Sequence, residues 1–301
     1  MRAAPFLAVL VLVLAACSNT PPAALPTGEP PAGSAPLDAA ALAFDSDRTG
    51  NFEIFVARVD GSQLRQLTAD AAYDSWWARI APDRRRILFY RTPKGTHDRD
   101  YTKTSLWMMN ADGTDQRHLL PAGGNGWDMH GHAEWSPEGD RLVMFGGQRM
   151  NPQIFVTDLR GGSPRAITAR GGQNLDPSWS PDGERIVFVG CPAAICFERD
   201  YEVYVVPAAG GEAARLTENG LRDHDPYYSP DGRSIAWLQQ TDTAGPVGVW
   251  NIRLMLSDGS QQRAVTNDRH INSKPEWSRD GAAIFFHRFE AGGDRWRLFT
   301  V

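Results

Sequence analysis

Histidine and aspartate side chains are the groups of this 301-residue chain whose types and spacing could do chemistry. His130 and His132 form an H-x-H pair, and Asp223-His224-Asp225 adds imidazole and carboxylate groups. Such groups bind divalent metal ions. Alternate residues of a β-strand share a face, so His130 and His132 could both reach one ion. The spacing fixes no third or fourth ligand. One divalent ion therefore stays an alternative to no cofactor, with His130, His132 and His224 as candidate ligands.

Most of these residues also precede, by a fixed number of residues, five equivalent positions of a sequence repeat. We call these positions the anchors: Ile80, Trp135, Trp179, Tyr228 and Trp277. Counting back three residues gives Trp77, His132, Asp176, Asp225 and Lys274, and counting back five gives Ser75, His130, Asn174, Asp223 and Asn272. One of these two columns should face a shared cavity, although Asp176-Pro177 and Asp225-Pro226 could instead simply shape turns. The candidate ligand-binding residues are Asp74, His130, His132, Asp176, Asp223, His224, Asp225 and Lys274. No catalytic residue is assigned.

The anchors belong to a repeated segment. Ser178-Trp179-Ser180-Pro181-Asp182-Gly183 shows it most completely, and related copies surround Trp135, Tyr228 and Trp277, with a degenerate copy at Ile80. Successive anchors are 55, 44, 49 and 49 residues apart. Such a period is typical of propeller repeats and not of helical solenoids. We interpret the anchoring Trp residues as wedges between blades.

Each repeat continues with short apolar runs separated by Gly-containing turns, which are hairpin signals. No window shows a convincing helical period. Four strands in each of six units predict an all-β fold, a six-bladed β-propeller of four-stranded antiparallel blades over residues 38–301. The first unit lacks its opening strand and the last its final strand. We therefore expect residues 37–40 to supply the outer strand of the last blade.

The turns divide the predicted propeller into two rims. Tight Ser-Pro-Asp-Gly and Asp-Gly turns suit one rim, because Pro presets φ and Gly accepts a positive φ. The irregular segments 91–104, 190–201 and 239–249 then fall on the opposite rim, together with the polar columns. Variable loops on a rigid scaffold are where binding usually resides.

The repeat resembles that of the TolB-like propellers, or Pro-Asp repeat proteins. Tyr201-Glu202-Val203-Tyr204-Val205-Val206 and Asn51-Phe52-Glu53-Ile54-Phe55-Val56 match it well, and the resemblance covers roughly residues 38–301. TolB itself carries a separate N-terminal α/β domain, and here a short tether stands in that place. The chain is therefore not expected to be TolB, and the binding of TolB to its partner Pal cannot be carried over.

The N-terminus resembles that of bacterial lipoproteins. One Arg precedes an apolar run from Phe6 to Ala16, which has the length of a signal-peptide core. Leu14-Ala15-Ala16-Cys17 is similar to a lipobox, which implies cleavage of residues 1–16 and lipidation of Cys17. Ser18 after the Cys implies the outer membrane, facing the periplasm. Residues 17–37 then form a Pro/Ala/Gly-rich tether.

Two cysteines remain once Cys17 is assigned to the lipid. Cys191 and Cys196 lie in one predicted loop, and the compartment is oxidising. We predict a disulfide between them, because their spacing does not match a C-x-x-C metal or redox motif.

Composition narrows the class of function. The formal net charge of −5 argues against nucleic acid as a partner. We predict a monomeric, membrane-anchored envelope protein that presents its loop-rich rim and channel mouth to a protein, peptide or glycan.

The alternative is a metal-dependent propeller enzyme. Propellers that resemble prolyl oligopeptidases need a hydrolase domain, and no G-x-S-x-G motif occurs. A closer resemblance is to oligogalacturonate lyase, a propeller with a His-bound metal, which implies roles for His130, His132 and His224. No nucleophile set is present, so we expect binding and not catalysis.

Overall fold

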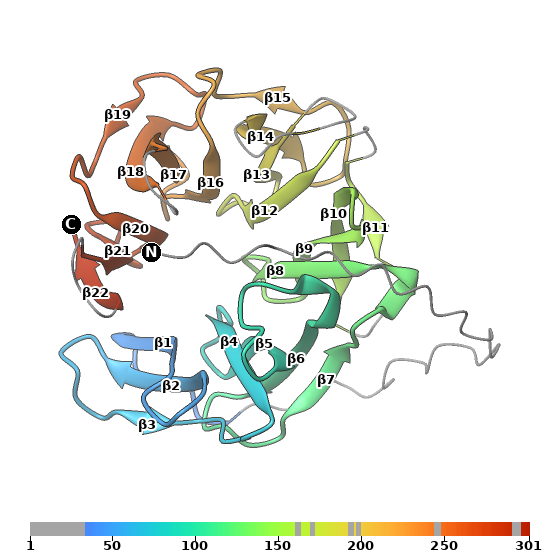
Figure 1. The fold of residues 1–301 in the computed structure, drawn as a ribbon, viewed down its shortest axis with the longest axis vertical. Coiled ribbons are helices and arrows are strands. Elements are labelled where there is room, and N and C mark those ends of the chain that lie inside the picture. Colours follow the sequence, from blue (N-terminus) through green and yellow to red (C-terminus); the bar gives the residue numbers. More distant parts are fainter. Residues whose placement is uncertain are drawn as a thin grey trace, which may run out of the picture.

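The computed structural model describes residues 34–159, 164–168, 172–191, 196, 200–243, 248–290 and 296–301. These residues form an all-β propeller, in which sheets are arranged around a central axis (Figure 1). The predicted signal peptide, Cys17 and the tether up to residue 33 lie outside the described residues. The described part contains no helix long and apolar enough to cross a membrane.

Hydrogen bonding divides the strands into five sheets. The first contains β1 (Ala41–Ser46), β2 (Glu53–Arg58) and β3 (Arg65–Gln66). The second contains β4 (Tyr73–Ile80), β5 (Arg86–Pro93), β6 (Ser105–Asn110) and β7 (Arg117–Leu120). The third contains β8 (Met129–Trp135), β9 (Arg141–Gln148), β10 (Asn151–Asp158) and β11 (Arg165–Ala166).

The fourth sheet contains β12 (Asn174–Trp179), β13 (Arg185–Gly190), β14 (Glu202–Pro207) and β15 (Ala214–Arg215). The fifth contains β16 (Asp223–Tyr228), β17 (Ser234–Asp242), β18 (Val249–Leu256), β19 (Arg263–Ala264), β20 (Ile271–Trp277), β21 (Ile284–Phe289) and β22 (Trp296–Thr300). Two short 3₁₀ helices, η1 (Tyr101–Lys103) and η2 (Gly124–Gly126), lie in connections between strands.

The prediction of six separate four-stranded antiparallel blades is wrong. The five sheets have three, four, four, four and seven strands, and only the middle three have the predicted composition. The seven-stranded sheet arises because β18 and β20 pair in parallel at Trp250 and Ile271. A repeat count assigns strands to units, but it cannot show a pairing that crosses from one unit to the next.

The expected closing strand is also absent from its predicted place. Leu37 N donates to Arg84 O (2.9 Å), and Val59 N donates to Ala40 O (2.9 Å). Leu37 packs against the apolar cluster that contains Ile54 and Val56. Residues 37–40 therefore lie beside the first sheet and the β4–β5 turn, and not along β22.

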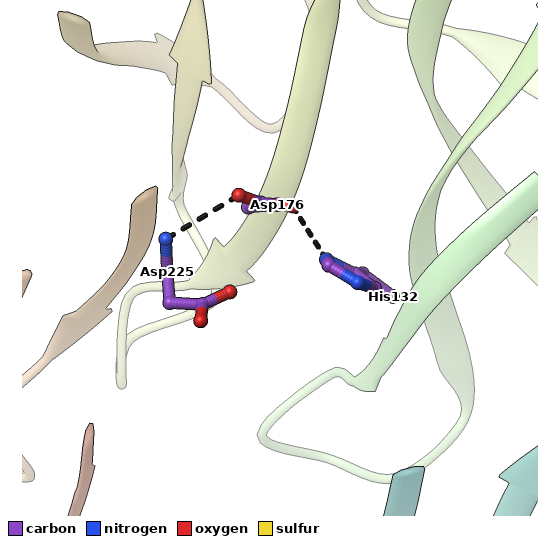
Figure 2. Close-up of side chains that lie close together, drawn as sticks. All are labelled: His132, Asp176 and Asp225. Carbon is purple, nitrogen blue, oxygen red and sulfur yellow. Dashed lines mark hydrogen bonds and ion pairs between the residues drawn. The ribbon is translucent and has the colours of Figure 1, made fainter. Parts of the chain in front are cut away.

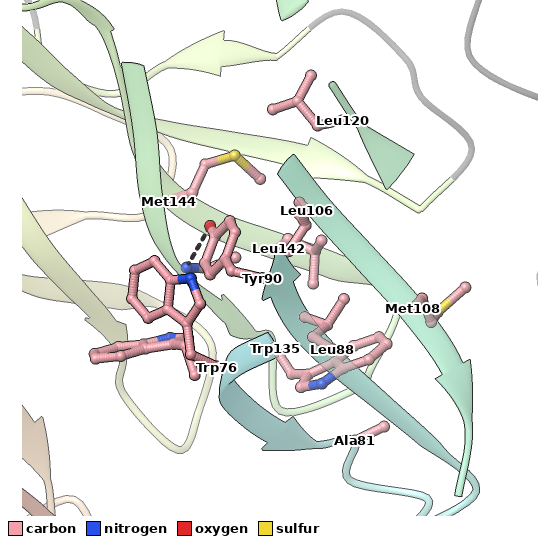
Figure 3. Packing of buried hydrophobic residues seen from close by; sticks show 12 residues of the cluster. Trp76, Ala81, Leu88, Tyr90, Leu106, Met108, Leu120, Trp135, Leu142 and Met144 are labelled. Carbon is pink, nitrogen blue, oxygen red and sulfur yellow. Dashed lines mark hydrogen bonds between the residues drawn. The ribbon is translucent and has the colours of Figure 1, made fainter. Parts of the chain in front are cut away.

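The anchor tryptophans pack between neighbouring sheets, as predicted. Trp135 of β8 belongs to a buried cluster with Leu88 and Met108 of the preceding sheet and with Ala81 of its β4–β5 turn (Figure 3). Its Nε1 donates to Arg79 O at 3.0 Å, which satisfies the indole in an apolar setting. This contact fixes β8 against β4.

The Ser-Pro-Asp-Gly turns have a common construction. Ser180 Oγ donates to Asp182 Oδ1 (2.5 Å), which also accepts from Glu184 N (2.9 Å). Gly183 has a φ of +71° and lies against Pro137 of the preceding turn. The turns of neighbouring sheets thus touch one another.

Candidate functional site

A cavity of about 410 Å³ lies at the centre of the propeller, between the inner strands of its sheets. Its lining comes from β4, β8, β12, β16 and β20, from the segments that follow β5, β13 and β15, and from single residues of β9, β17 and β18. This volume falls in the range of small-ligand sites in proteins. We call it the channel-mouth cavity.

The five inner strands share one backbone irregularity. Each shows a register shift against its neighbour, and each shift contains one residue with a left-handed φ: Trp77 (57°), His132 (49°), Asp176 (51°), Asp225 (46°) and Lys274 (52°). Non-Gly residues rarely adopt this conformation, and bulges commonly re-aim a side chain. All five residues line the channel-mouth cavity. The column three residues before each anchor therefore faces the cavity.

Asp176 joins two imidazoles in this cavity. Its Oδ1 lies 2.5 Å from His132 Nδ1, and its Oδ2 lies 2.6 Å from His224 Nδ1 (Figure 2 shows the first contact). Asp225 N also lies 3.4 Å from Asp176 Oδ2. Burial alone would raise the pKa of Asp176, but His132 and His224 outweigh it and lower that pKa well below its usual range.

The His132 ring is held on both sides. Trp77 stacks on it with ring centroids 4.0 Å apart and an interplanar angle of 7°. The Tyr101 hydroxyl lies 2.7 Å from His132 Nε2 and donates to Asp98 Oδ1 at 2.5 Å. Because its proton is directed to Asp98, the Tyr101 oxygen accepts from a protonated Nε2 of His132. Burial opposes protonation of His132, but Asp176 outweighs it and raises the pKa of His132.

Asp225 brings a second carboxylate close to this pair. It is only 9% exposed, and within the described residues no hydrogen bond reaches its carboxylate oxygens. Burial and the neighbouring Asp176 raise the pKa of Asp225. One ligand atom from each of His132, Asp176 and Asp225 lies within 4.8 Å of the other two.

Cations and aromatic rings complete the wall. Lys274 Nζ lies 5.1 Å from the Trp77 ring centroid and 3.8 Å from Asp98 Oδ2. Arg222 Nε donates to His224 Nε2 at 3.0 Å, and its guanidinium lies 5.3 Å from the Trp250 ring centroid. The cavity therefore offers hydrogen-bond donors, acceptors and ring faces together.

A second layer of polar side chains follows two residues further along the inner strands. Arg79 pairs with Glu134 and donates to the Tyr227 hydroxyl at 2.9 Å, and that hydroxyl donates to Glu134 Oε1 at 3.1 Å. The Arg79 guanidinium also lies 4.2 Å from the Trp77 ring centroid. This linked layer supports the residues of the channel-mouth cavity.

The structure brings together five of the eight candidate ligand-binding residues. His132, Asp176, His224, Asp225 and Lys274 line the channel-mouth cavity.

Asp74, His130 and Asp223 do not line it. Asp74 accepts from Phe52 N and Gly95 N, and Asp223 accepts from Thr217, Trp237 and Gln239. His130 is fully buried, with Nε2 3.2 Å from Pro121 O. The register shift between Gly131 and Glu134 interrupts the strand alternation on which a shared His130–His132 face depended.

Several lining residues were not among the candidates: Asp98, Tyr101, Tyr201, Arg222 and Trp250. Asp98, Tyr101 and Tyr201 lie in the long segments 91–104 and 190–201, and Trp250 directly follows segment 239–249. The signal for these positions was loop length, which marks the rim but not the individual side chain.

Cys191 and Cys196 are joined by a disulfide. The loop between them lies outside the described residues, as does Cys17.

Comparison with known proteins shows similarity to TolB-like β-propellers. Residues 114–243 match the family model described as the TolB beta propeller domain, so this part of the chain is similar to a TolB-like β-propeller. A solved structure from Agrobacterium tumefaciens, described as a TolB, superimposes with a TM-score of 0.65 at 18% identity. That match covers 86% of this chain and 85% of the other.

Curated relatives match over shorter stretches. An uncharacterized protein of Agrobacterium fabrum is 32% identical over 33% of this chain, and a TolB homolog of Chlorobium luteolum is 28% identical over 49% of it. The matches span about a third of the length of these relatives, 34% and 31%. The propeller of an oligogalacturonate lyase in complex with manganese is also similar, with a TM-score of 0.52 at 14% identity over 83% of each chain. At such identities the solved structures show the fold alone.

Proposed function

We propose that this chain is an envelope protein that binds a protein, peptide or glycan in its channel-mouth cavity. The observation that supports this most is the convergence of five left-handed residues on one cavity of about 410 Å³. Backbone strain of this kind persists where the surrounding structure fixes it, and it concentrates at ligand sites. A scaffold with no ligand has no need to direct two histidines, two aspartates and a lysine into one cavity.

The lining suits one polar group of a larger ligand. Trp77, Tyr101 and Trp250 present aromatic faces, while Lys274 and Asp225 present opposite charges. Aromatic faces with a few oriented polar groups are typical of ligand pockets. One side chain of a peptide or one sugar ring fits this size and chemistry.

The predicted anchor gives this site a location. We propose that residues 1–16 are removed, that Cys17 carries the lipid, and that residues 17–37 tether a monomeric propeller of residues 38–301 to the outer membrane. A TolB-like propeller domain agrees with an envelope location. The cavity would then face the periplasm.

Site-directed photo-crosslinking in the host cell tests the proposal. Met129 lines the cavity, whereas Ala282 lies exposed in the β20–β21 turn on the opposite rim. With p-benzoylphenylalanine at position 129 we expect a discrete adduct, which weakens in a Lys274→Gln background. With p-benzoylphenylalanine at position 282 we expect no adduct. Equal adducts from both positions, or none from position 129, would contradict a binding site at the channel mouth.

A second candidate function is a metal-dependent polysaccharide lyase. The observation in its favour is the His132, Asp176 and Asp225 cluster in a propeller similar to a manganese-bound oligogalacturonate lyase. His130 takes no part in this version, because it lies outside the cavity. Incubation with Mn²⁺ and oligogalacturonate would then yield an unsaturated product that absorbs ultraviolet light. No rise in absorbance with an excess of the full chain would exclude this activity.

A further inference from the structure

Three inner strands each contribute one metal-binding group to the same point in the channel-mouth cavity. His132 comes from β8, Asp176 from β12 and Asp225 from β16, and one ligand atom from each lies within 4.8 Å of the others. Their side chains converge in Figure 2. Because these residues are far apart in sequence, no local turn brings them together.

The Tyr101 contact determines which nitrogen of His132 is available. Since the Tyr101 hydroxyl donates to Asp98, it holds the proton of His132 on Nε2. Nδ1 then offers a lone pair toward the cavity. A partner that fixes one ring nitrogen in this way is the usual arrangement around a metal-bound imidazole.

The contact between His132 and Asp176 needs a compensating positive charge. His132 is 9% exposed, and its buried Nδ1 makes no hydrogen bond of acceptable geometry, although Asp176 Oδ1 lies only 2.5 Å away. A nitrogen lone pair and a carboxylate oxygen repel each other at that distance unless a proton lies between them or a metal ion binds both.

Asp225 favours the metal ion over the proton. A proton shared by His132 and Asp176 compensates one carboxylate only, and the Asp225 carboxyl group lies buried beside it with no hydrogen bond in the described part of the chain. Buried charges are normally paired or bound to metal. A divalent cation would compensate both carboxylates at once.

Neighbouring residues hold the three groups in place. His224 Nδ1 lies 2.6 Å from Asp176 Oδ2, so the carboxylate is oriented with Oδ1 toward His132. Trp77 fixes the plane of His132 by stacking. Such supporting contacts orient metal ligands and tune their affinity.

We propose that His132 Nδ1 and the carboxylates of Asp176 and Asp225 bind one divalent cation, Mn²⁺ or Zn²⁺. One imidazole with two carboxylates suits these ions better than Ca²⁺ or Mg²⁺, which prefer oxygen ligands alone. Three protein ligands leave coordination positions open toward the cavity. An oxygen atom of the bound protein, peptide or glycan would occupy one of these open coordination positions. This last inference rests on the proposed binding function.

Titration of the full chain in detergent, stripped with EDTA, tests the ion site itself. Isothermal titration with MnCl₂ and with ZnCl₂ should give one site per chain. Asp225→Asn should weaken it by more than about tenfold, because even the loss of a residue that only supports a metal ligand costs about that much. Glu276→Gln is the matched control, because it removes one carboxylate near the same channel without touching the cluster. Its affinity should stay within about twofold of the wild type.

A spectroscopic readout separates coordination from simple attraction of cations. Pulsed electron paramagnetic resonance of bound Mn²⁺ should show coupling to one imidazole nitrogen, which His132→Asn abolishes while circular dichroism confirms the fold. The site would be overturned if neither Mn²⁺ nor Zn²⁺ bound stoichiometrically. Equal weakening by Asp225→Asn and Glu276→Gln would also overturn it, as would a spectrum without nitrogen coupling. Crosslinking from position 129 tests ligand binding separately, so the two proposals can fail independently.

Discussion

Two histidines separated by one residue have opposite environments. Burial lowers the pKa of His130 to about 4, whereas the Asp176 carboxylate raises that of His132 despite burial. The difference is one of partners, because His130 meets a backbone carbonyl and His132 meets a carboxylate. His130 is therefore a neutral interior residue, and His132 belongs to the site.

The buried His130 should make the protein less stable in acid. An imidazole in the unfolded chain has a pKa of about 6.5, so below this pH the unfolded state binds a proton that the folded state does not. The free energy of unfolding should fall between pH 6.5 and pH 4, by about 2.5 kcal/mol at pH 4.5 from this residue. Urea unfolding of wild type and His130→Gln at pH 7.5 and 4.5 measures this. Identical pH dependence in both proteins would refute it.

At the scale of the strand, the bulges place the site. A regular strand would alternate its side chains, but each register shift turns one residue of β4, β8, β12, β16 and β20 toward the cavity. The site is therefore made by an irregularity that the inner strands share.

The left-handed conformation at Lys274 has a measurable energetic cost. Lys274→Ala and Lys274→Gly both remove the same side-chain contacts, but only Gly adopts a φ of +52° without steric penalty. The Gly variant should be more stable than the Ala variant by about 1 kcal/mol in urea unfolding. At Ser273, whose φ is not positive, the order should reverse. The same order at both positions would refute strain at Lys274.

The packing of Trp135 between sheets should dominate local stability. Trp135→Ala removes a buried indole and its hydrogen bond to Arg79 O, with an expected loss of about 3–5 kcal/mol. Met150 is 72% exposed, and Met150→Ala should change the free energy of unfolding by less than about 0.5 kcal/mol. Chemical denaturation monitored by circular dichroism measures both variants. Similar small losses would show that Trp135 is not a wedge.

The sequence predicted the elements better than their pairing. Anchors such as Trp135 and Trp179 located the inner strands, because the repeated turn that follows each anchor joins the inner strand to the next strand of a hairpin. The pairing of Trp250 with Ile271 was invisible, because it joins two segments through backbone hydrogen bonds and not through side-chain pattern. Residues 37–40 were misplaced because a missing strand does not say where the chain end packs.

For the molecule as a whole, the cavity depends on distant segments coming together. Counting back from the anchors found Asp176, Asp225 and Lys274, since each occupies the same position in its repeat. Asp98 and Tyr101 could not be found in this way, because they lie in a connection that follows no repeat. The repeat thus provides the residues of the inner strands that face the cavity, and the loops add side chains that the repeat does not predict.

The central claim is that the channel-mouth cavity is where this envelope protein meets its ligand. Its most direct test is the yield of photo-crosslinked adduct in host cells from position 129 in the cavity, compared with position 282 on the opposite rim. The account predicts an adduct from position 129 that decreases with Lys274→Gln, and none from position 282. An adduct from position 282 alone would contradict it.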